Sequence, residues 1–206
     1  MPAPPSSPSP LRRIARELRA LPQLRALPAP VALFHARASL AAQRSGDDWS
    51  LESATRVQDL ATLLDLARGR RRVAELGTAT AWTATALALA DRERQVVTYD
   101  PIARPQRERY LALAGHDARA RVRLVDEPGD SGGDPAAPVD LLYIDSSHER
   151  AATIAEVEAW RPALAPGAIV VFDDYVHPDY PGVREAIREL DLDGEVVGTL
   201  FVHRAT

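Results

Sequence analysis

Acidic side chains stand directly after several apolar runs of this sequence, where buried strands are expected to end. Asp100, Asp145 and the pair Asp173-Asp174 each occupy such a place. In open α/β sheets, ligands bind outside the carboxyl ends of the strands, so we expect these carboxylates at one edge. Carboxylate oxygens suit Mg²⁺, and also Mn²⁺ or Ca²⁺. Asp145, Asp173 and Asp174 are therefore candidate metal ligands, although the residues alone favour simple caps of a loop and a helix.

A histidine that could act as a general base, His148, lies three residues after Asp145. An imidazole with a pKa of about 6.5 can accept a proton near neutral pH. The alternative is a solvated histidine at the start of a helix. His177 is a second and weaker candidate for the same role. A catalytic lysine is excluded, because all 25 basic residues are arginine, and a cysteine nucleophile is excluded, because no cysteine is present. No G-x-S-x-G motif for a serine nucleophile occurs either.

A glycine turn follows the first of these runs. Val73–Leu76 is expected to form a buried strand, Gly77 ends it, and Ala79–Ala90 is expected to form a helix. Such a turn directs backbone N–H groups and a positive helix end at one point, which suits a polar or anionic ligand group. The buried carboxylate of Glu75 needs a partner, which a cationic ligand group could be. Only one of the three glycines of a dinucleotide fingerprint is present, so an ordinary loop is the alternative.

The acid after the second run points to a nucleoside. Asp100, followed by Pro101, lies 23 residues after the turn glycine. In Rossmann-type sheets an acid at about this spacing accepts hydrogen bonds from ribose hydroxyls, and a plain turn aspartate is the alternative. Further along, the loop Gly129-Asp130-Ser131 could line an adenine pocket.

Strands that alternate with helices must position these residues. The 206 residues suffice for one α/β domain, and short connections predict a mostly parallel sheet with helices on both faces. The closing pair must be antiparallel, because its turn is very short. Besides the first, the expected strands are Gln95–Tyr99, Val122–Val125, Val139–Ile144, Ala168–Phe172, Glu195–Val197 and Leu200–His203.

The expected helices follow the apolar periodicity. They include Val31–Gln43, a helix that Ser50 could cap, Pro105–Ala114, Glu149–Leu164 and a helix from Pro181 through Leu190. The Ser50 helix would present an apolar face made by Val57, Leu60, Leu63, Leu64 and Leu66.

The beginning of the chain has a different composition. Residues 1–10 are rich in proline and serine and are expected to be a disordered tail. The Arg-rich amphipathic segment Leu11–Leu21 could be a transit peptide or a membrane-surface helix, but a helix docked on the domain or on a second subunit is favoured. We therefore divide the chain into the tail, N-terminal helices over 11–49 that cap the substrate or contact a dimer partner, and a catalytic domain over 50–206.

Composition limits the partners and the location. The net charge of −4 provides no basic field for nucleic acid. No apolar run approaches the roughly 20 residues of a membrane span, so a cytoplasmic protein is expected.

Five segments, taken together and in order, resemble class I S-adenosylmethionine-dependent methyltransferases. The nearest branch is that of the catechol and caffeoyl-CoA O-methyltransferases and their small bacterial relatives, and the resemblance covers roughly Ser50 to His203. The segments are Val73–Thr83, Val97–Pro101, Leu142–His148, Leu164–Asp174 and Pro181–Arg184. The resemblance implies a Rossmann-like seven-stranded, mostly parallel sheet with the last strand antiparallel and extra N-terminal helices.

The resemblance also implies S-adenosylmethionine as the cofactor. Thr83 matches the position that holds the methionine carboxylate, and Ala81 stands where the family usually has glycine. The remaining positions implied for cofactor binding are Glu75, Gly77, Thr78, Asp100, Pro101, Asp130, Ser131 and Asp145.

For the reaction, the resemblance implies O-methylation of a small-molecule hydroxyl assisted by Mg²⁺ or another divalent cation on Asp145, Asp173 and Asp174. His148 stands where metal-dependent members have a lysine that deprotonates the substrate, so His148 and Asp145 are the expected catalytic residues. The acceptor pocket would be built by the N-terminal helices and the segment Tyr175–Tyr180. A metal-independent N- or O-methyltransferase is the alternative, followed by a nucleotide-binding oxidoreductase, and a homodimer remains open.

Overall fold

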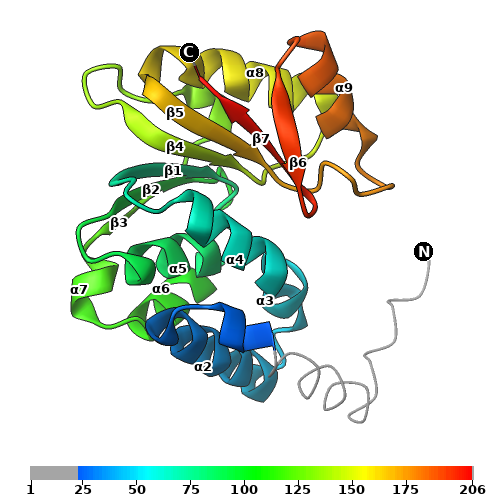
Figure 1. Cartoon of the computed structure of the whole chain (residues 1–206). Coiled ribbons are helices and arrows are strands. Elements are labelled where there is room, and N and C mark those ends of the chain that lie inside the picture. The colour runs from blue at the N-terminus through cyan, green and yellow to red at the C-terminus, as the bar shows by residue number, and fades with distance from the viewer. Residues whose placement is uncertain (1–22, 206) are drawn as a thin grey trace.

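The computed structural model describes residues 23–205, which form a seven-stranded sheet covered by helices on both faces (Figure 1). The predicted tail and the Arg-rich segment Leu11–Leu21 lie outside the described residues. The strand order is β3-β2-β1-β4-β5-β7-β6. The first five strands run parallel to one another, and β7 is antiparallel to both β5 and β6. The predicted fold class is confirmed.

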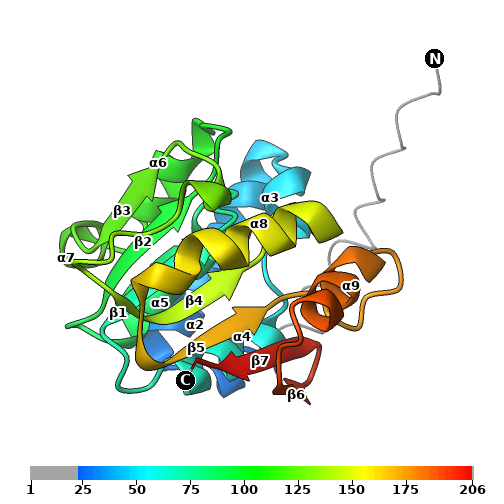
Figure 2. The same cartoon turned by 90° about the horizontal axis from the view of Figure 1, so that it is seen from above.

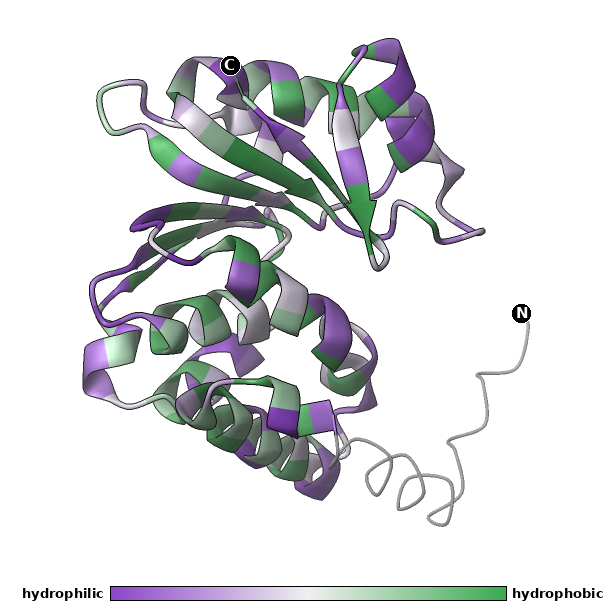
Figure 3. Ribbon diagram, in the orientation of Figure 1, coloured by the Kyte–Doolittle hydropathy of each residue, from purple (hydrophilic) through white to green (hydrophobic). Residues whose placement is uncertain are grey.

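The strands lie close to their predicted positions, because buried parallel strands produce unbroken apolar runs. Their bounds are β1 Arg72–Leu76, β2 Gln95–Tyr99, β3 Val122–Val125, β4 Val139–Ile144, β5 Leu164–Phe172, β6 Gly194–Val197 and β7 Leu200–Arg204. Figure 3 shows hydrophobic residues concentrated along the central strands. The β6–β7 connection contains only two residues, as the antiparallel prediction requires.

Most helices are shorter than the periodicity suggested, whereas α2 extends beyond the predicted Val31–Gln43 at both ends. Their bounds are α2 Ala29–Ser45, α3 Asp48–Glu52, α4 Val57–Leu66, α5 Trp82–Ala90, α6 Gln106–Ala112, α7 His116–Arg119, α8 Arg150–Trp160 and α9 Pro181–Glu189, with 3₁₀ turns at Leu24–Ala26, Gly129–Ser131 and Arg161–Ala163. No helix within residues 23–205 is long and apolar enough to cross a membrane.

Three predicted boundaries were wrong. Helix α5 begins at Trp82, because Ala79 and Ala81 adopt left-handed φ angles of 45° and 67° that no helix can contain. Helix α8 ends at Trp160, where the 3₁₀ turn Arg161–Ala163 follows; Pro162 in this turn has no N–H to continue the α-helical hydrogen bonds, and β5 then starts earlier than expected.

The helix assigned to a Ser50 cap is two helices. Asp47 caps α3, because its carboxylate accepts hydrogen bonds from the Ser50 backbone N–H at 3.2 Å and from the Ser50 hydroxyl at 2.8 Å. Ser50 itself is buried within α3, and a turn at 53–56 leads into α4. This turn brings Arg56 to the carboxyl edge of the sheet.

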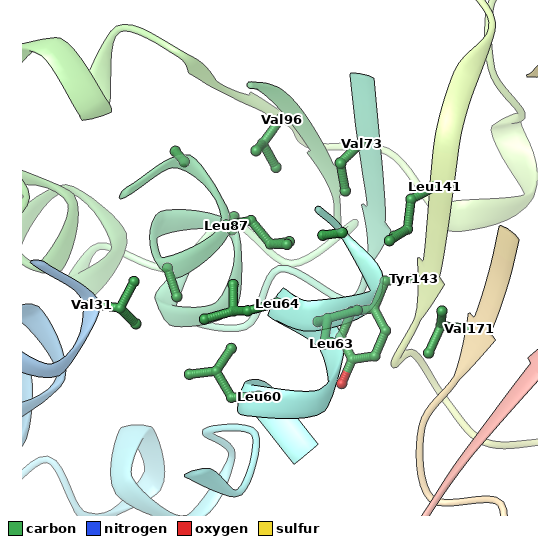
Figure 4. Close-up of a cluster of buried hydrophobic side chains, with 14 of the residues drawn as sticks. Val31, Leu60, Leu63, Leu64, Val73, Leu87, Val96, Leu141, Tyr143 and Val171 are labelled. Carbon is green, nitrogen blue, oxygen red and sulfur yellow. The ribbon is translucent and has the colours of Figure 1, made fainter. Parts of the chain in front are cut away.

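Two cores separate the helices into layers. Helices α2, α4 and α5 pack on one face of the sheet, whereas α8 and α9 cover the other (Figures 1 and 2). Neighbouring residues of β4 alternate between these cores, with Leu141 and Tyr143 facing the first and Leu142 and Ile144 the second. Figure 4 shows the first core, in which leucines of α4 lie with Leu87 of α5 and the strand residues.

The boundary between N-terminal helices and catalytic domain stays a prediction. Within the described residues, Val31 of α2 shares a core cluster with α4 and the sheet. The Phe34 and Trp82 rings also meet edge to face with centroids 6.4 Å apart. Helix α2 is therefore packed onto the sheet-bearing part of the chain.

Candidate active site

A cavity of about 730 Å³ opens at the carboxyl ends of β1, β2, β4 and β5. Its wall is completed by the α3–α4 turn and by the segment after β5. Of the predicted site residues, those that line it are Gly77, Thr78, Thr83, Asp100, Pro101, Asp130, Asp145, His148, Asp173, Asp174 and His177. Glu75 and Ser131 do not line the cavity. Most of the polar residues chosen from the sequence therefore share one site.

Gly77 lies where β1 and β4 come closest. Its φ is 104°, and a Cβ atom at this position would lie 1.8 Å from the backbone oxygen of Asp145. Any other side chain would have to push the two strand ends apart. Glycine is therefore required to keep the cofactor turn beside Asp145.

Asp100 connects the first turn to the second strand. One carboxylate oxygen accepts the Ala79 N–H at 3.0 Å and pairs with Arg107 at 2.8 Å, and the other accepts the Ile102 N–H at 2.8 Å. A carboxylate has further lone pairs, so Asp100 keeps capacity for ribose hydroxyls. Arg107 is buried, and it also donates to the Ala79 oxygen and to Asp126. The sequence did not single it out, since Arg107 stands among other arginines of a helix.

Glu75 lies beneath the turn, fully buried in β1. Its carboxyl oxygen accepts a hydrogen bond of 2.5 Å from Thr98, whose oxygen lies 2.7 Å from that of Thr78. Burial raises the pKa of Glu75 to about 8. A positive ligand group nearby would favour the ionised form, so this position suits a cationic cofactor.

Only part of the predicted adenine loop, Gly129–Ser131, reaches the cavity. Asp130 lines the cavity, whereas Ser131 is exposed, and its role as an adenine contact stays a prediction. Glu156 of α8 lines the same end and accepts a hydrogen bond from Ser146 at 2.8 Å. Burial raises the pKa of Glu156 to about 7. The sequence offered a signal that was not used, namely an acid at a buried position of α8.

At the reactive end, three carboxylates gather around His148. Its Nε2 atom lies 3.3 Å from Asp145 Oδ1 and 3.6 Å from Asp174 Oδ2. Burial lowers the pKa of His148, but the surrounding carboxylates outweigh this effect and raise it. Asp173 is adjacent through the sheet, where its N–H donates to the Ile144 oxygen at 2.9 Å. Burial and the neighbouring carboxylates raise the pKa of Asp173 to about 7.

The segment before α9 holds the backbone and ring of His148. His148 has a left-handed φ of 59°. Tyr180 stacks on its ring with a centroid distance of 4.5 Å, and His177 stacks on Tyr180 at 4.6 Å. Gly182 lies so close that a Cβ atom there would be 2.6 Å from the His148 oxygen. The imidazole is thereby fixed from outside its own loop.

The predicted metal ligands are already engaged by the chain itself. Asp173 accepts hydrogen bonds from the Tyr143 hydroxyl at 2.8 Å and from the Asp174 N–H at 2.8 Å. Asp174 pairs with Arg56 at 3.1 Å. Within residues 23–205, no group of three or more His, Asp and Glu side chains is placed to hold a metal ion. Three carboxylates would suit a hard cation by their chemistry, but their arrangement here does not fit one.

Unsatisfied polar atoms point to a ligand in the cavity. Across the described part of the chain, four buried side-chain atoms lack a hydrogen-bond partner, and all four belong to residues that line it. They are Ser53 Oγ, Trp82 Nε1, Arg104 Nε and His148 Nε2. Buried polar atoms are normally paired, so a polar ligand is expected to contact some of them. These residues, together with the turn and Asp100, fit a nucleoside cofactor with charged groups.

Comparison with known proteins agrees with this geometry. Residues 74–175 match the family model described as "Methyltransferase domain". No curated protein matches the chain. The solved structures with similar folds are under 25% identical and therefore establish the fold, which is that of class I methyltransferases.

Three of these structures illustrate the similarity. A TDP-rhamnose 3′-O-methyltransferase of calicheamicin biosynthesis has a TM-score of 0.60 and 20% identity, covering 97% of this chain and 96% of that one. The cofactor-bound protein Rv0187 from MTB has a TM-score of 0.61 and 21% identity, and the match covers 97% of this chain and 98% of that one. A caffeoyl-CoA O-methyltransferase candidate from Staphylococcus aureus has a TM-score of 0.65 and 12% identity, and the match covers 95% of this chain and 100% of that one.

Proposed function

We propose that this S-adenosylmethionine-dependent methyltransferase methylates a hydroxyl group of a small molecule. One observation carries the proposal: the cavity joins the Gly77–Asp100 edge to the His148 imidazole, whose Nε2 atom faces Asp145 and Asp174. The names of the similar structures support it, since they include O-methyltransferases of a sugar nucleotide and of a caffeoyl-CoA type. A cytoplasmic location and a homodimer stay predictions.

The residues of the cofactor end would hold S-adenosylmethionine. Asp100 would accept the ribose hydroxyls, and Thr83, whose oxygen lies 2.8 Å from that of Thr55, would bind the methionine carboxylate. Glu75 would compensate positive charge from beneath the turn. When bound, the cofactor supplies an electrophilic methyl group on a positively charged sulfur.

The chain's remaining tasks are to align the acceptor and to remove its proton. Methyl transfer needs the acceptor oxygen, the methyl carbon and the sulfur in line, which is mainly a matter of positioning. His148 Nε2 would take the hydroxyl proton as the acceptor oxygen gains the methyl group. Asp145 and Asp174 would stabilise the imidazolium that forms. These steps need no Mg²⁺ ion, and within residues 23–205 the predicted ligands are not arranged to hold one.

The proposal is tested by measuring formation of the demethylated cofactor with two acceptor sets, catechol-type phenols and nucleotide-linked sugars. His148→Ala is expected to lower kcat by about 10²-fold or more while the affinity for S-adenosylmethionine is retained. His116→Ala, which removes an exposed histidine outside the cavity, is the matched control, and its kcat should change little. Loss of turnover and cofactor affinity together in His148→Ala would remove this residue as the base.

Calorimetry separates the remaining function classes. We expect heat of binding with S-adenosylmethionine and none with NAD. Binding of NAD alone would favour the oxidoreductase alternative over methyl transfer.

A further inference from the structure

The carboxylate cluster, which we define as Asp145, Asp173 and Asp174, has a cation built into its edge. Arg56 Nη2 lies 3.1 Å from Asp174 Oδ1 and donates to Thr199 Oγ1 at 2.9 Å. Its Nε donates to Asp59 at 2.7 Å, and Asp59 is buried. The guanidinium is thus held from α4, from the end of β5 and from the β6–β7 turn. An arginine fixed on three sides is placed to compensate charge here.

A phenol hydroxyl occupies the interior of the same cluster. Tyr143 is fully buried in β4 and its hydroxyl donates to Asp173 Oδ2 at 2.8 Å. The same hydroxyl lies 3.4 Å from Asp145 Oδ2. Because the Asp174 N–H uses the other oxygen of Asp173, both oxygens of that carboxylate already have donors. Each oxygen keeps one lone pair, so the positive charge of Arg56 beside Asp174, and not a lack of lone pairs, is what opposes a divalent cation here.

His148 completes the contacts. Its Nε2 atom lies 3.3 Å from Asp145 and 3.6 Å from Asp174, so every carboxylate of the cluster is next to a polar side chain of this chain. Burying carboxylates costs free energy unless their negative charge is balanced, and a bound divalent cation is one way to balance it. In this chain the guanidinium of Arg56, the hydroxyl of Tyr143 and the imidazole of His148 lie where they can balance that charge instead.

We propose that methyl transfer by this chain is independent of divalent metal, because Arg56, Tyr143 and His148 compensate the carboxylate cluster in place of a metal ion. This inference rests on the proposed methyl transfer. Arg56 acts here as a positioning residue that keeps Asp174, and through it His148, in place.

Binding of metal is measured directly, apart from activity. The full chain, stripped with EDTA and saturated with S-adenosylhomocysteine, is titrated calorimetrically with Mg²⁺ and with Mn²⁺. We expect no saturable heat. Saturable binding that disappears in Asp173→Asn would overturn the inference.

Activity gives a second measurement. Turnover is expected to be the same in EDTA as in excess Mg²⁺. Turnover that is lost in EDTA and restored by Mg²⁺ would overturn the inference but leave the proposed function standing. If S-adenosylmethionine binds but no hydroxyl acceptor is methylated in either condition, the proposed function fails, and the calorimetric titration alone decides the metal question.

Variants of Arg56 test the compensating charge. Arg56→Met keeps an apolar stem and is expected to lower kcat by about tenfold without changing the KM for S-adenosylmethionine. Arg56→Lys retains a cation and should recover part of that loss. Arg68→Met, which removes an arginine of an exposed ion pair with Asp65, is the matched control and should behave as wild type. An unchanged kcat in folded Arg56→Met would contradict the assigned role.

Discussion

Tyr180 stacks on His148 with the two rings 21° from parallel and their centroids 4.5 Å apart. The two residues come from separate segments, one before α9 and one before α8. The base of the proposed reaction is therefore oriented by a ring outside its own loop. This contact connects the segment that is proposed to line the acceptor pocket to the proposed base.

Tyr180→Ala is expected to lower kcat by about fivefold, since an aromatic pair contributes about 1 kcal/mol beyond its buried area. The affinity for S-adenosylmethionine should not change, because the cofactor end lies elsewhere. Tyr180→Phe keeps the ring and should retain wild-type kcat. Steady-state kinetics of both variants provides the check, and an equal loss in both would assign the effect to the hydroxyl group instead.

Gly77→Ala is expected to destabilise the fold by more than about 3 kcal/mol, because the new Cβ atom would meet the Asp145 oxygen at 1.8 Å. Gly69→Ala is the matched control. Gly69 has a comparable positive φ of 73° but nothing within 4 Å, so only backbone strain of about 1 kcal/mol remains. Denaturant unfolding of both variants measures the difference, which should vanish if close approach is unimportant.

Asp100→Asn is expected to weaken S-adenosylmethionine binding by at least about tenfold and to cost roughly 2 kcal/mol of stability, because a buried charged hydrogen bond to Arg107 is lost. Asp126→Asn removes the other carboxylate partner of Arg107, which is exposed. That change should cost less than about 1 kcal/mol and leave cofactor affinity intact. Calorimetric binding and thermal unfolding distinguish the two, and equal cofactor affinities would contradict the ribose role.

Glu75 makes the cofactor-free protein sensitive to pH. Burial raises its pKa to about 8 from an ordinary 4.5, so the folded chain keeps a proton that the unfolded chain releases. The stability contributed by the protonated form is complete below the unfolded pKa and falls as pH rises toward the folded pKa.

Glu75→Gln should remove this slope and be more stable than wild type by roughly 3 kcal/mol at about pH 7. Unfolding by denaturant between about pH 5 and about pH 8 gives the comparison. Parallel stability curves for the two proteins would show that Glu75 does not titrate in this range.

Much of the sheet could be predicted from the sequence, because parallel strands buried on both faces are short apolar runs. The carboxyl-edge rule then placed Asp100, Asp145 and Asp173 at one cavity. Local backbone conformation was harder to predict. The left-handed angles of Ala79 and Ala81, which delay α5, are rare for alanine, so the two residues themselves do not predict them.

The contacts on which the proposed metal independence rests could not be predicted from the sequence. Arg56 meets Asp174 and Thr199 across 118 and 143 residues of chain. Tyr143 resembles any aromatic residue of a buried strand until its hydroxyl is placed beside Asp173. Pairing of this kind depends on strand order and side-chain direction, which composition and periodicity do not specify.

The two-residue connection between β6 and β7 has a consequence for how this protein could diversify. Through Thr199 it touches the guanidinium beside the reactive carboxylates, although it lies at the far edge of the sheet and almost at the end of the chain. Changes in this hairpin would alter the charge environment of Asp174 through Arg56, without changing the residues that are proposed to bind the nucleoside. Laboratory evolution toward new acceptors could therefore vary this hairpin, which lies apart from the proposed cofactor-binding residues.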